Sequence, residues 1–311
     1  ALSDISQLSF LETVNSLTIN SNALGSLNGL ENLHTVFEDL TISNESLENF
    51  NELSSLQTIG GSLNITNNML LNDVTAFNNI VLLDELYVVR CPNLSNFSGL
   101  ENIQDISGRL RIGYNTTLTD MSVFSNLNSV GDLDIYDNDN LVSLSGLGNL
   151  QFVSNRLFVS RNILLSSIDA LNNLSTSQIN QVAIINNVNL VVCSNLFMCT
   201  VIADPSVLKS IYNNNVGCNT LEEVETACNL SISEKDLNEA IAVFPNPVSD
   251  LLYVNISDGI GLERIAVFSI LGQQLIDSKG GVVNFSSLSK GVYFVEVYTD
   301  RGRINKKVVK R

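Results

Sequence analysis

The sequence offers few side chains that could perform acid–base or nucleophilic chemistry. His34 is the only histidine among 311 residues, and it lies between the apolar residues Leu33 and Val36. Because histidine is the commonest general base, no Ser-His-Asp set can be assembled without a better-placed one. No glycine-rich phosphate loop follows a predicted strand. We therefore predict that the chain is not an enzyme and needs no cofactor.

The run Asp137-Asn138-Asp139-Asn140 is the best candidate for a metal site. Its oxygens suit a hard cation such as calcium, but the Gly and Glu that follow in an EF-hand loop are missing. Asn138 also recurs at a structural position of the repeat described below. A solvated bend is the favoured interpretation. We predict no metal, with calcium binding as the alternative, which an unchanged melting temperature with a chelator would exclude.

Arg111, Asp134 and Arg161 could lie near one another if successive segments of the chain stack. A polysaccharide lyase would need clustered acids and bases on one sheet face. One aspartate with two arginines is more typical of a surface ion pair, which contributes little. A polysaccharide-degrading β-helix enzyme, or an accessory protein, is therefore an alternative hypothesis.

A repeat of 23 to 25 residues determines where these side chains would lie. Each copy opens with Leu-x-Ile or a variant, whose alternation predicts a short strand with one apolar face. Apolar residues then follow at every third position, which favours a coil that turns inward once per triplet. A fixed period in this range is typical of a solenoid. The copies open at Leu17, Leu40, Leu63, Leu86, Leu110, Leu133, Leu157 and Val182.

The fifth position after each opening residue is almost always asparagine. A buried asparagine can both donate to and accept from backbone groups at a bend, so the repeated position predicts a ladder of side chains along the stack. The second copy has Glu45 there, with Asn44 one place early, and the fourth has Cys91, which we expect to be a buried free thiol. The other copies hold Asn22, Asn68, Asn115, Asn138, Asn162 and Asn187.

Aromatic and charged residues gather on the outward side of the central predicted strands. Tyr87, Arg111, Asp134 and Phe158 lie between the two apolar positions of their copies, and Tyr136 follows Asp134 on the same side. Aromatic residues and arginine are favoured at binding hot spots, so these five are the candidate ligand-binding residues. Strand propensity alone would also place aromatics here, and we weigh the two interpretations evenly. The ligand would be an unknown glycan or protein.

Four cysteines follow the last copy: Cys193, Cys199, Cys218 and Cys228. An even, local cluster predicts two disulfides that close the end of the stack in an oxidising compartment. Three pairings are possible, and short loops favour Cys193–Cys199 with Cys218–Cys228. A zinc site lacks support because there is no CxxC pair and no nearby histidine.

The same region predicts a complete cap on the repeats. Residues 210–215 resemble a last repeat strand. Asn219, with Glu222 three residues later, predicts a capped helix that ends near Cys228.

Residues 243–311 differ from the repeat region, residues 1–228, and follow a predicted linker, residues 229–242. Short alternating runs separated by turn residues predict a β-sandwich. Residues 1–242 hold 26 Asp and Glu against 7 Lys and Arg, which argues against nucleic acid as a partner. No apolar run reaches the roughly 18–20 residues of a transmembrane helix.

The repeat resembles the leucine-rich repeat and, more closely, the receptor L-domain family. The shared phrase is Leu-x-Ile-x-x-Asn-x-x-Leu-x-x-Leu-x-Gly-Leu, over about residues 1–190. This resemblance implies a mainly β, right-handed solenoid. Residues 1–14 match the back half of a copy, so we expect a segment upstream. The glycine of the phrase is present at Gly29, Gly99 and Gly146, whereas Ala76, Val123 and Ala170 replace it elsewhere.

The C-terminal region resembles the type A sorting domain of the type IX secretion system of Bacteroidota. The resemblance implies two partners, the outer-membrane translocon and a sorting peptidase, and a secreted or cell-surface location reached through the periplasm of a Gram-negative bacterium. An ordinary sandwich whose basic last strand blunts a sheet edge is the alternative. We expect deletion of residues 300–311 to trap the protein in the periplasm. The matching residues are Phe244, Pro245, Asn246, Pro247, Gly272, Gly291, Tyr293, Gly302, Lys306, Lys307 and Lys310.

Together these features predict a non-catalytic binding or adhesion protein. A structural component of a surface layer is a further alternative, which regular self-association without a discrete ligand would reveal.

Overall fold

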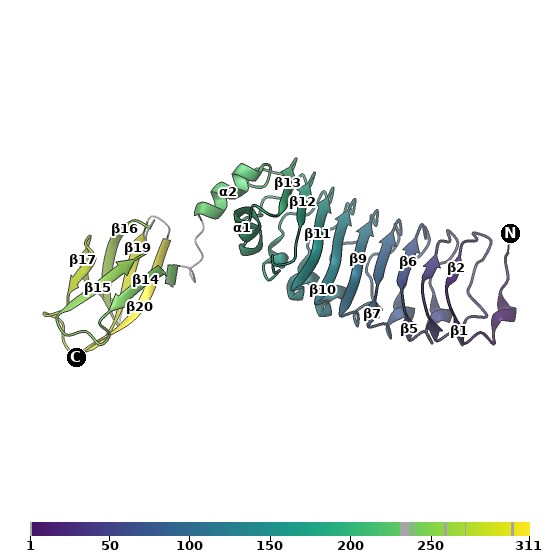
Figure 1. The fold of residues 1–311 in the computed structure, drawn as a ribbon, viewed down its shortest axis with the longest axis horizontal. Helices are drawn as coiled ribbons and strands as arrows, with labels where there is room; N and C mark the ends of the chain where they lie inside the picture. The colour runs from purple at the N-terminus through teal and green to yellow at the C-terminus, as the bar shows by residue number, and fades with distance from the viewer. Residues whose placement is uncertain (1, 231–236, 239, 258–259, 271, 300–301) are drawn as a thin grey trace. The chain divides into compact units, whose positions relative to one another are not determined.

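The computed structural model describes residues 2–230, 237–238, 240–257, 260–270, 272–299 and 302–311. The chain forms two compact units, Ala1–Glu225 and Thr226–Arg311 (Figure 1). The fold is mainly β in both units, and we describe each unit by itself. Half of the predicted linker, residues 229–242, lies outside the described residues, and its boundary at 242 stays a prediction although a strand already begins at Ile241.

A parallel sheet built from one strand per repeat dominates the first unit (Figure 1). Leu17 is paired with Leu40, and this register continues copy by copy to Val182, which is paired with Lys209. The predicted repeat alignment is therefore confirmed. The strands, in spatial order, are β2 (Leu17–Ile19), β4 (Leu40–Ile42), β6 (Ser62–Thr66), β8 (Glu85–Val89), β9 (Asp105–Gly113), β10 (Ser129–Tyr136), β11 (Phe152–Ser160), β12 (Gln181–Ile185) and β13 (Leu208–Tyr212).

A second set of short strands lies at another corner of the coils. β1 (Thr13–Val14), β3 (Thr35–Val36) and β5 (Thr58–Ile59) form a small parallel sheet, and β7 (Leu82–Leu83) pairs with β9. In β9, β10 and β11 the two strand positions merge into one long strand. The register shifts between Val130 and Asp132, as in a β-bulge. Gly131 occupies this bulge because a Cβ there would lie 2.5 Å from the Gly108 carbonyl oxygen.

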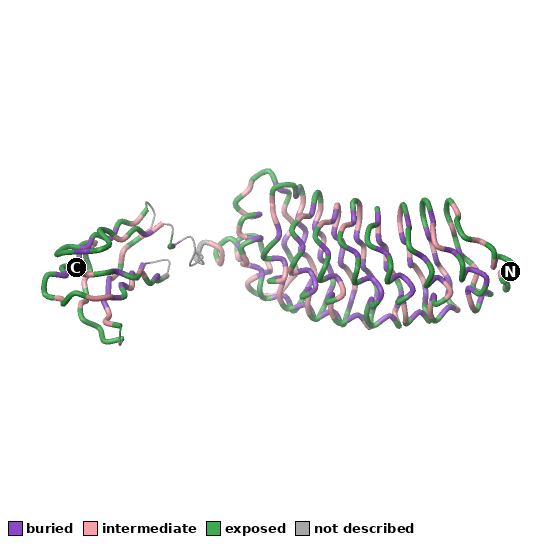
Figure 2. The backbone as a smooth tube through the Cα atoms, turned by 90° about the horizontal axis from the view of Figure 1, so that it is seen from below, coloured by how far each residue is buried: buried purple, intermediate pink, exposed green. Residues whose placement is uncertain are grey.

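The triplet spacing of apolar residues forms 3₁₀ turns in most copies. A 3₁₀ helix has three residues per turn, so every third side chain points the same way. Leu144, Leu147 and Leu150 are each at most 1% exposed, and buried residues recur in every coil (Figure 2). The 3₁₀ helices are η1 (Ser6–Leu8), η2 (Asn51–Leu53), η3 (Thr75–Phe77), η4 (Ser122–Asn126), η5 (Ser145–Asn149) and η6 (Asp169–Leu171).

The predicted asparagine ladder is present from the second copy onward. The side-chain oxygen of Asn138 accepts from the Asn115 backbone N–H at 3.1 Å, and its amide donates to the Ile112 carbonyl at 3.1 Å. From Asn68 onward the residue before each ladder position has a left-handed backbone, as at Tyr114 (φ 56°) and Asp137 (φ 51°). The fully buried members are Asn44, Asn68, Cys91, Asn115, Asn138, Asn162 and Asn187.

The prediction for Asn22 is wrong. This side chain is exposed, and its oxygen accepts from the Glu45 backbone N–H at 3.1 Å. In the early copies the bend contains no residue with a left-handed backbone and is one residue shorter than in the later copies. Asn44 therefore fills the ladder position only four residues after Leu40. At the other end the ladder continues beyond the predicted copies: Asn214 accepts from the Asn187 backbone N–H at 2.9 Å.

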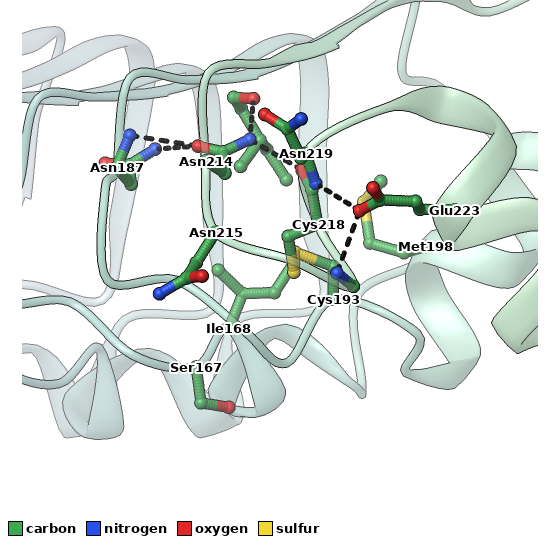
Figure 3. The surroundings of a disulfide bond; sticks show 12 residues. Ser167, Ile168, Asn187, Cys193, Met198, Asn214, Asn215, Cys218, Asn219 and Glu223 are labelled. Atoms are coloured by element: carbon green, nitrogen blue, oxygen red, sulfur yellow. Dashed lines mark hydrogen bonds between the residues drawn. A yellow bond between two sulfur atoms is a disulfide. The ribbon is translucent and has the colours of Figure 1, made fainter.

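The cap contains a strand, two helices and a disulfide whose pairing differs from the predicted one. Cys193 is bonded to Cys218 across 25 residues, not to Cys199 (Figure 3). Cys199 and Cys228 are disulfide-bonded as well, and Cys91 is the free thiol. The favoured pairing by shortest loops therefore fails, because the bond joins the end of one coil to the end of the next. The helices are α1 (Leu196–Ala203) and α2 (Leu221–Leu230).

The N-cap of α2 is one residue later than predicted. Thr220 Oγ1 accepts from the Glu223 backbone N–H at 3.1 Å, so Thr220 and not Asn219 is the cap. The Glu223 carboxylate in turn accepts from the backbone of Gly217 at 2.8 Å and Asn219 at 3.0 Å (Figure 3). These contacts satisfy N–H groups that would otherwise be unpaired at the start of the helix.

The second unit consists of two antiparallel sheets with one shared core. Val267, Phe285, Val295 and Val308 are among its fully buried side chains. Leu237, which lies in the predicted linker, is 2% exposed within the same core. One sheet contains β14 (Ile241–Phe244), β15 (Leu251–Ile256) and β18 (Val282–Asn284), and the other contains β17 (Gln274–Ser278), β16 (Leu262–Ser269), β19 (Gly291–Thr299) and β20 (Gly302–Lys310).

Candidate binding face

The outward side chains of β8 to β11 form the candidate site, which we call the strand face. Parallel register places Tyr87, Arg111, Asp134 and Phe158 in consecutive positions on neighbouring strands. Tyr136 lies in the next row, between Gly113 and Ser160. The structure thus brings all five predicted residues onto one side of the sheet, because a shared register in a parallel stack aligns equivalent positions.

Asp134 is the centre of this face and is itself hidden. Its side chain is 2% exposed, and Arg111, Arg156 and Arg109 surround its carboxylate. Arg156 Nη2 lies 2.6 Å from Oδ1, Arg111 Nη2 lies 3.1 Å from Oδ2, and Arg109 Nε lies 3.6 Å from Oδ2. A buried carboxylate needs such partners because desolvation of its charge is costly. Asp134 therefore positions arginines and does not present its own oxygens to a ligand.

Three members of the cluster were missed by the sequence analysis: Arg109, Asp132 and Arg156. Asp132 is paired with Arg109 on one side and Arg156 on the other, two residues before Asp134 and on the same side. The sequence does contain a signal for these three residues, since the period-two alternation of a strand places residues two apart on the same face. It was overlooked because these residues precede the opening leucine of their copies, where the strands were expected to begin.

Asp132 is held ionised by its neighbours. Burial favours a raised pKa, but hydrogen bonds from Arg109 and Asn155 and the charges of Arg109 and Arg156 outweigh it and lower the pKa of Asp132. Arg109 Nη2 lies 2.7 Å from Asp132 Oδ2, and Asn155 Nδ2 lies 2.7 Å from Oδ1. The hydrogen bond to Asp132 raises the pKa of Arg109. Asp132 and Arg109 therefore form an ion pair that stays charged over the physiological pH range.

Aromatic rings pack beside these arginines. A Cβ on Gly113 would lie 2.5 Å from the Tyr136 ring, so the ring covers this glycine. The Tyr136 ring is 5.4 Å from the Tyr114 ring in an edge-on arrangement and 6.3 Å from the Phe158 ring. Burial raises the pKa of Tyr136, which keeps its hydroxyl protonated. Replacement of Gly113 by a larger residue would displace Tyr136 from this position.

Cation–π contacts connect the arginines of the strand face with its aromatic rings. The Arg111 guanidinium lies 5.6 Å from the Tyr87 ring, and that of Arg156 lies 5.4 Å from the Phe158 ring. Each contact contributes about 0.5–1 kcal/mol at an exposed site. The arginines are thereby fixed on both sides, by carboxylates and by rings. The three arginines form a rigid array, in which 30% to 32% of each arginine side chain is exposed.

Arg161 does not join Asp134. It lies 3.6 Å from Asp137 at the adjacent corner of the coil, where Arg90 also lies 5.3 Å from the Tyr114 ring. Arg111 and Asp134 lie together as predicted, but Arg161, the third residue of that predicted group, lies apart from them. Asn138, which lies in the run 137–140 that was predicted to be a solvated bend, is a member of the asparagine ladder. Among the residues that the structure describes, no group of three or more His, Cys, Asp or Glu could hold a metal ion.

The predicted sorting residues have defined roles in the second unit. Asn246 accepts from the Val309 N–H at 2.9 Å and donates to the Lys307 carbonyl at 2.8 Å, so it joins the opening segment to β20. Tyr293 donates to the Ser289 carbonyl at 2.8 Å, and Phe244 stacks on Tyr253. Pro245 and Pro247 are both cis, Gly272 has φ 79°, Gly291 and Gly302 begin β19 and β20, and Lys306, Lys307 and Lys310 lie on β20.

Comparison with known families identifies the second unit. The family model described as the secretion system C-terminal sorting domain matches residues 242–311. This match assigns the chain a type IX secretion sorting domain, and the protein is therefore secreted or displayed at the cell surface. No curated protein matches the chain. In the described residues, every helix is too short or too polar to cross a membrane.

Proposed function

We propose that the protein is a non-catalytic binding or adhesion protein whose repeat unit recognises its ligand through the strand face. The repeat unit would be a right-handed solenoid of the receptor L-domain-like or leucine-rich-repeat class. The sorting domain would engage the outer-membrane translocon of the type IX system and then its sorting peptidase.

The observation that carries this proposal is the rigid cluster of Tyr87, Arg111, Tyr136, Arg156 and Phe158 around the buried Asp134. Aromatic rings and arginines provide most of the energy at binding hot spots. Because these side chains are already held in place before binding, less conformational entropy is lost when a ligand binds. A structural role alone would not require so many large side chains to remain partly exposed on neighbouring strands.

The same geometry argues against the polysaccharide-degrading enzyme. A general base needs a free lone pair within reach of substrate, whereas both oxygens of Asp134 accept hydrogen bonds from arginines. Asp132 also accepts from Arg109 and Asn155. We therefore assign both carboxylates to the positioning of arginines. A newly formed double bond or a loss of viscosity in an acidic polysaccharide would contradict this assignment.

The test is the double variant Tyr87→Ala/Tyr136→Ala in the full chain. Binding to a glycan and protein array, or adhesion to cells, should fall about ten-fold or more because two hot-spot rings are lost. Tyr212→Ala is the matched control, since Tyr212 is an exposed aromatic in the same row as Tyr136 but outside the cluster. Unchanged binding by the double variant would show that the rings are only structural. Regular self-association without a ligand would favour the surface-layer alternative.

A further inference from the structure

The arginines of the repeat unit are confined to one place. Residues 1–225 contain 23 Asp and Glu spread along the chain, but their five arginines are Arg90, Arg109, Arg111, Arg156 and Arg161. Three of them lie on the strand face, and the other two lie at its adjacent corner, over β8 to β11. The only other cation of this range, Lys209, donates to the carbonyls of Asp204 and Val207. Asp132, Asp134, Asp137 and Glu85 lie among these five arginines, so the cluster keeps a small positive excess, whereas the rest of the unit is acidic and would repel an anion.

The arginines retain donors after binding their carboxylates. A guanidinium has five N–H groups in a planar fork that matches an oxyanion. Arg156 uses Nη2 for Asp134, whereas its Nε is buried without a hydrogen-bond partner among the described residues. Arg111 uses Nε and Nη2. The buried Nε is closed to a ligand, but Nη1 of Arg156 and Nη1 of Arg111 make no hydrogen bond within the described residues and can donate to a ligand oxygen.

The surroundings of the arginines favour a sugar over a protein. The rings of Tyr87, Tyr136 and Phe158 offer electron-rich faces on which the C–H side of a pyranose can pack. The outward positions beside the cluster are mixed, with polar Asn64 and Gln181 and apolar Val89, Ala183 and Ile185, but its centre is the charged group around Asp134. Protein interfaces instead place apolar residues at the centre and deplete charged residues there. An array of arginines and rings without an apolar centre suits a polar, charged chain.

We propose that the strand face over β8 to β11 binds an anionic polysaccharide, with its carboxylate or sulfate groups on Arg111 and Arg156 and its sugar rings on the aromatic side chains. This assignment rests on the proposed function and adds the class of ligand. Equivalent positions recur on each successive strand, so a polymer with regularly spaced anions would run across the strands from coil to coil.

The test is calorimetric titration of the full chain with polygalacturonate, its methyl-esterified form, dextran sulfate and dextran. Polygalacturonate or dextran sulfate should bind, and the affinity should fall as salt is raised. The uncharged polymers should bind about ten-fold more weakly or worse. Binding of polygalacturonate alone would assign carboxylate, and binding of dextran sulfate alone would assign sulfate as the anion. Equal binding of charged and uncharged polymers would overturn the inference.

Variants separate this inference from the proposed function. Arg111→Lys and Arg156→Lys retain the charge beside Asp134 but lose the fork, so the chain should fold and the affinity for the anionic polymer should fall about ten-fold. Arg264→Gln is the matched control, since Arg264 also lies over a tyrosine ring, that of Tyr298 at 4.1 Å, but in the second unit. If no polymer binds while Tyr87→Ala/Tyr136→Ala still weakens binding to a protein, only this inference fails. If no polymer binds and that double variant is silent, both fail.

Discussion

At the residue scale, the ladder asparagines hold the coils together through a set of hydrogen bonds that other side chains provide less completely. The amide is short, donates twice and accepts twice, and fits a bend where one coil faces the next. Asn138 shows this arrangement fully, since it contacts the backbone of Asn115 and Ile112 and the side chain of Asn162. Cys91 fills one ladder position more weakly, with Sγ 3.7 Å from the carbonyls of Ile65 and Val89.

Replacement of Asn138 by alanine should destabilise the repeat unit by about 2–5 kcal/mol. The change leaves the buried N–H of Asn115 and the carbonyl of Ile112 unpaired, and each unsatisfied group costs about 1–3 kcal/mol. Asn140→Ala is the control, because Asn140 lies in the same loop but its one bond, to the Thr116 carbonyl, is exposed. Chemical denaturation of both variants measures the difference. Equal losses would refute the ladder as the source of stability.

Asp132 predicts how the strand face depends on pH. The pKa of Asp132 is lowered in the folded chain, where hydrogen bonds from Arg109 and Asn155 and nearby arginine charges outweigh burial. The contribution of the ionised carboxylate is complete above the ordinary aspartate pKa of about 3.9 and is lost as the pH falls through the lower folded value. Asp132→Asn should therefore be less stable than wild type at neutral pH, and the difference should shrink below about pH 4. A pH-independent difference in denaturation midpoints would contradict this.

At the element scale, close contact between coils requires glycine where a 3₁₀ turn crosses the backbone of the previous copy. A Cβ on Gly146 would lie 1.6 Å from the Met121 carbonyl oxygen and 2.7 Å from the Ser122 Cα. Backbone atoms cannot move aside as the end of a flexible side chain could. Copies with Ala76 or Ala170 at this position must therefore follow a slightly different path.

Gly146→Ala should destabilise the protein by about 1–3 kcal/mol or more, since the added methyl group overpacks the contact between coils. Gly148→Ala is a matched control within the same 3₁₀ helix η5, because a Cβ there meets no atom within 4 Å. That control should change stability by less than about 0.5 kcal/mol. Thermal unfolding distinguishes the two variants. A Gly146→Ala protein as stable as the control would show that the coils can separate at little cost.

Sequence reasoning succeeded at this scale where the structure is periodic and failed where it is not. One period determines the register of every strand from Leu17 to Val182, because each coil contacts only its neighbours. The Cys193–Cys218 pairing could not be derived in this way, since it depends on how the last coil and the cap meet in space. Arg109 and Arg156 were missed because the long strands β9 and β11 pass through a corner that the repeat pattern treats as a turn.

At the scale of the whole molecule, the proposed binding face and the sorting domain lie in different units. The predicted deletion of residues 300–311 would remove all of β20, including Ile304 and Val308, which are at most 2% exposed in the core. Such a deletion unfolds the second unit and so cannot test a signal by itself. Lys307→Glu is a sharper change, since Lys307 is exposed while its strand neighbours remain in place. If the sorting machinery reads this charge, the variant should accumulate in the periplasm with an unchanged melting temperature of the second unit.

At the same scale, the disulfide between Cys193 and Cys218 can be used to test the stability of the first unit, because both of its cysteines lie in that unit. The bond between Cys193 and Cys218 closes a loop of 25 residues, which in the chain-entropy account stabilises by about 3 kcal/mol. Cys193→Ser/Cys218→Ser should therefore lower the melting temperature of the repeat unit by about 6–12 °C. Cys91→Ser is the control, since that thiol bonds to no other sulfur. The transition of the second unit should not move, because both replaced cysteines lie in the first unit. A reductant that shifts both transitions equally would show that the two units unfold together.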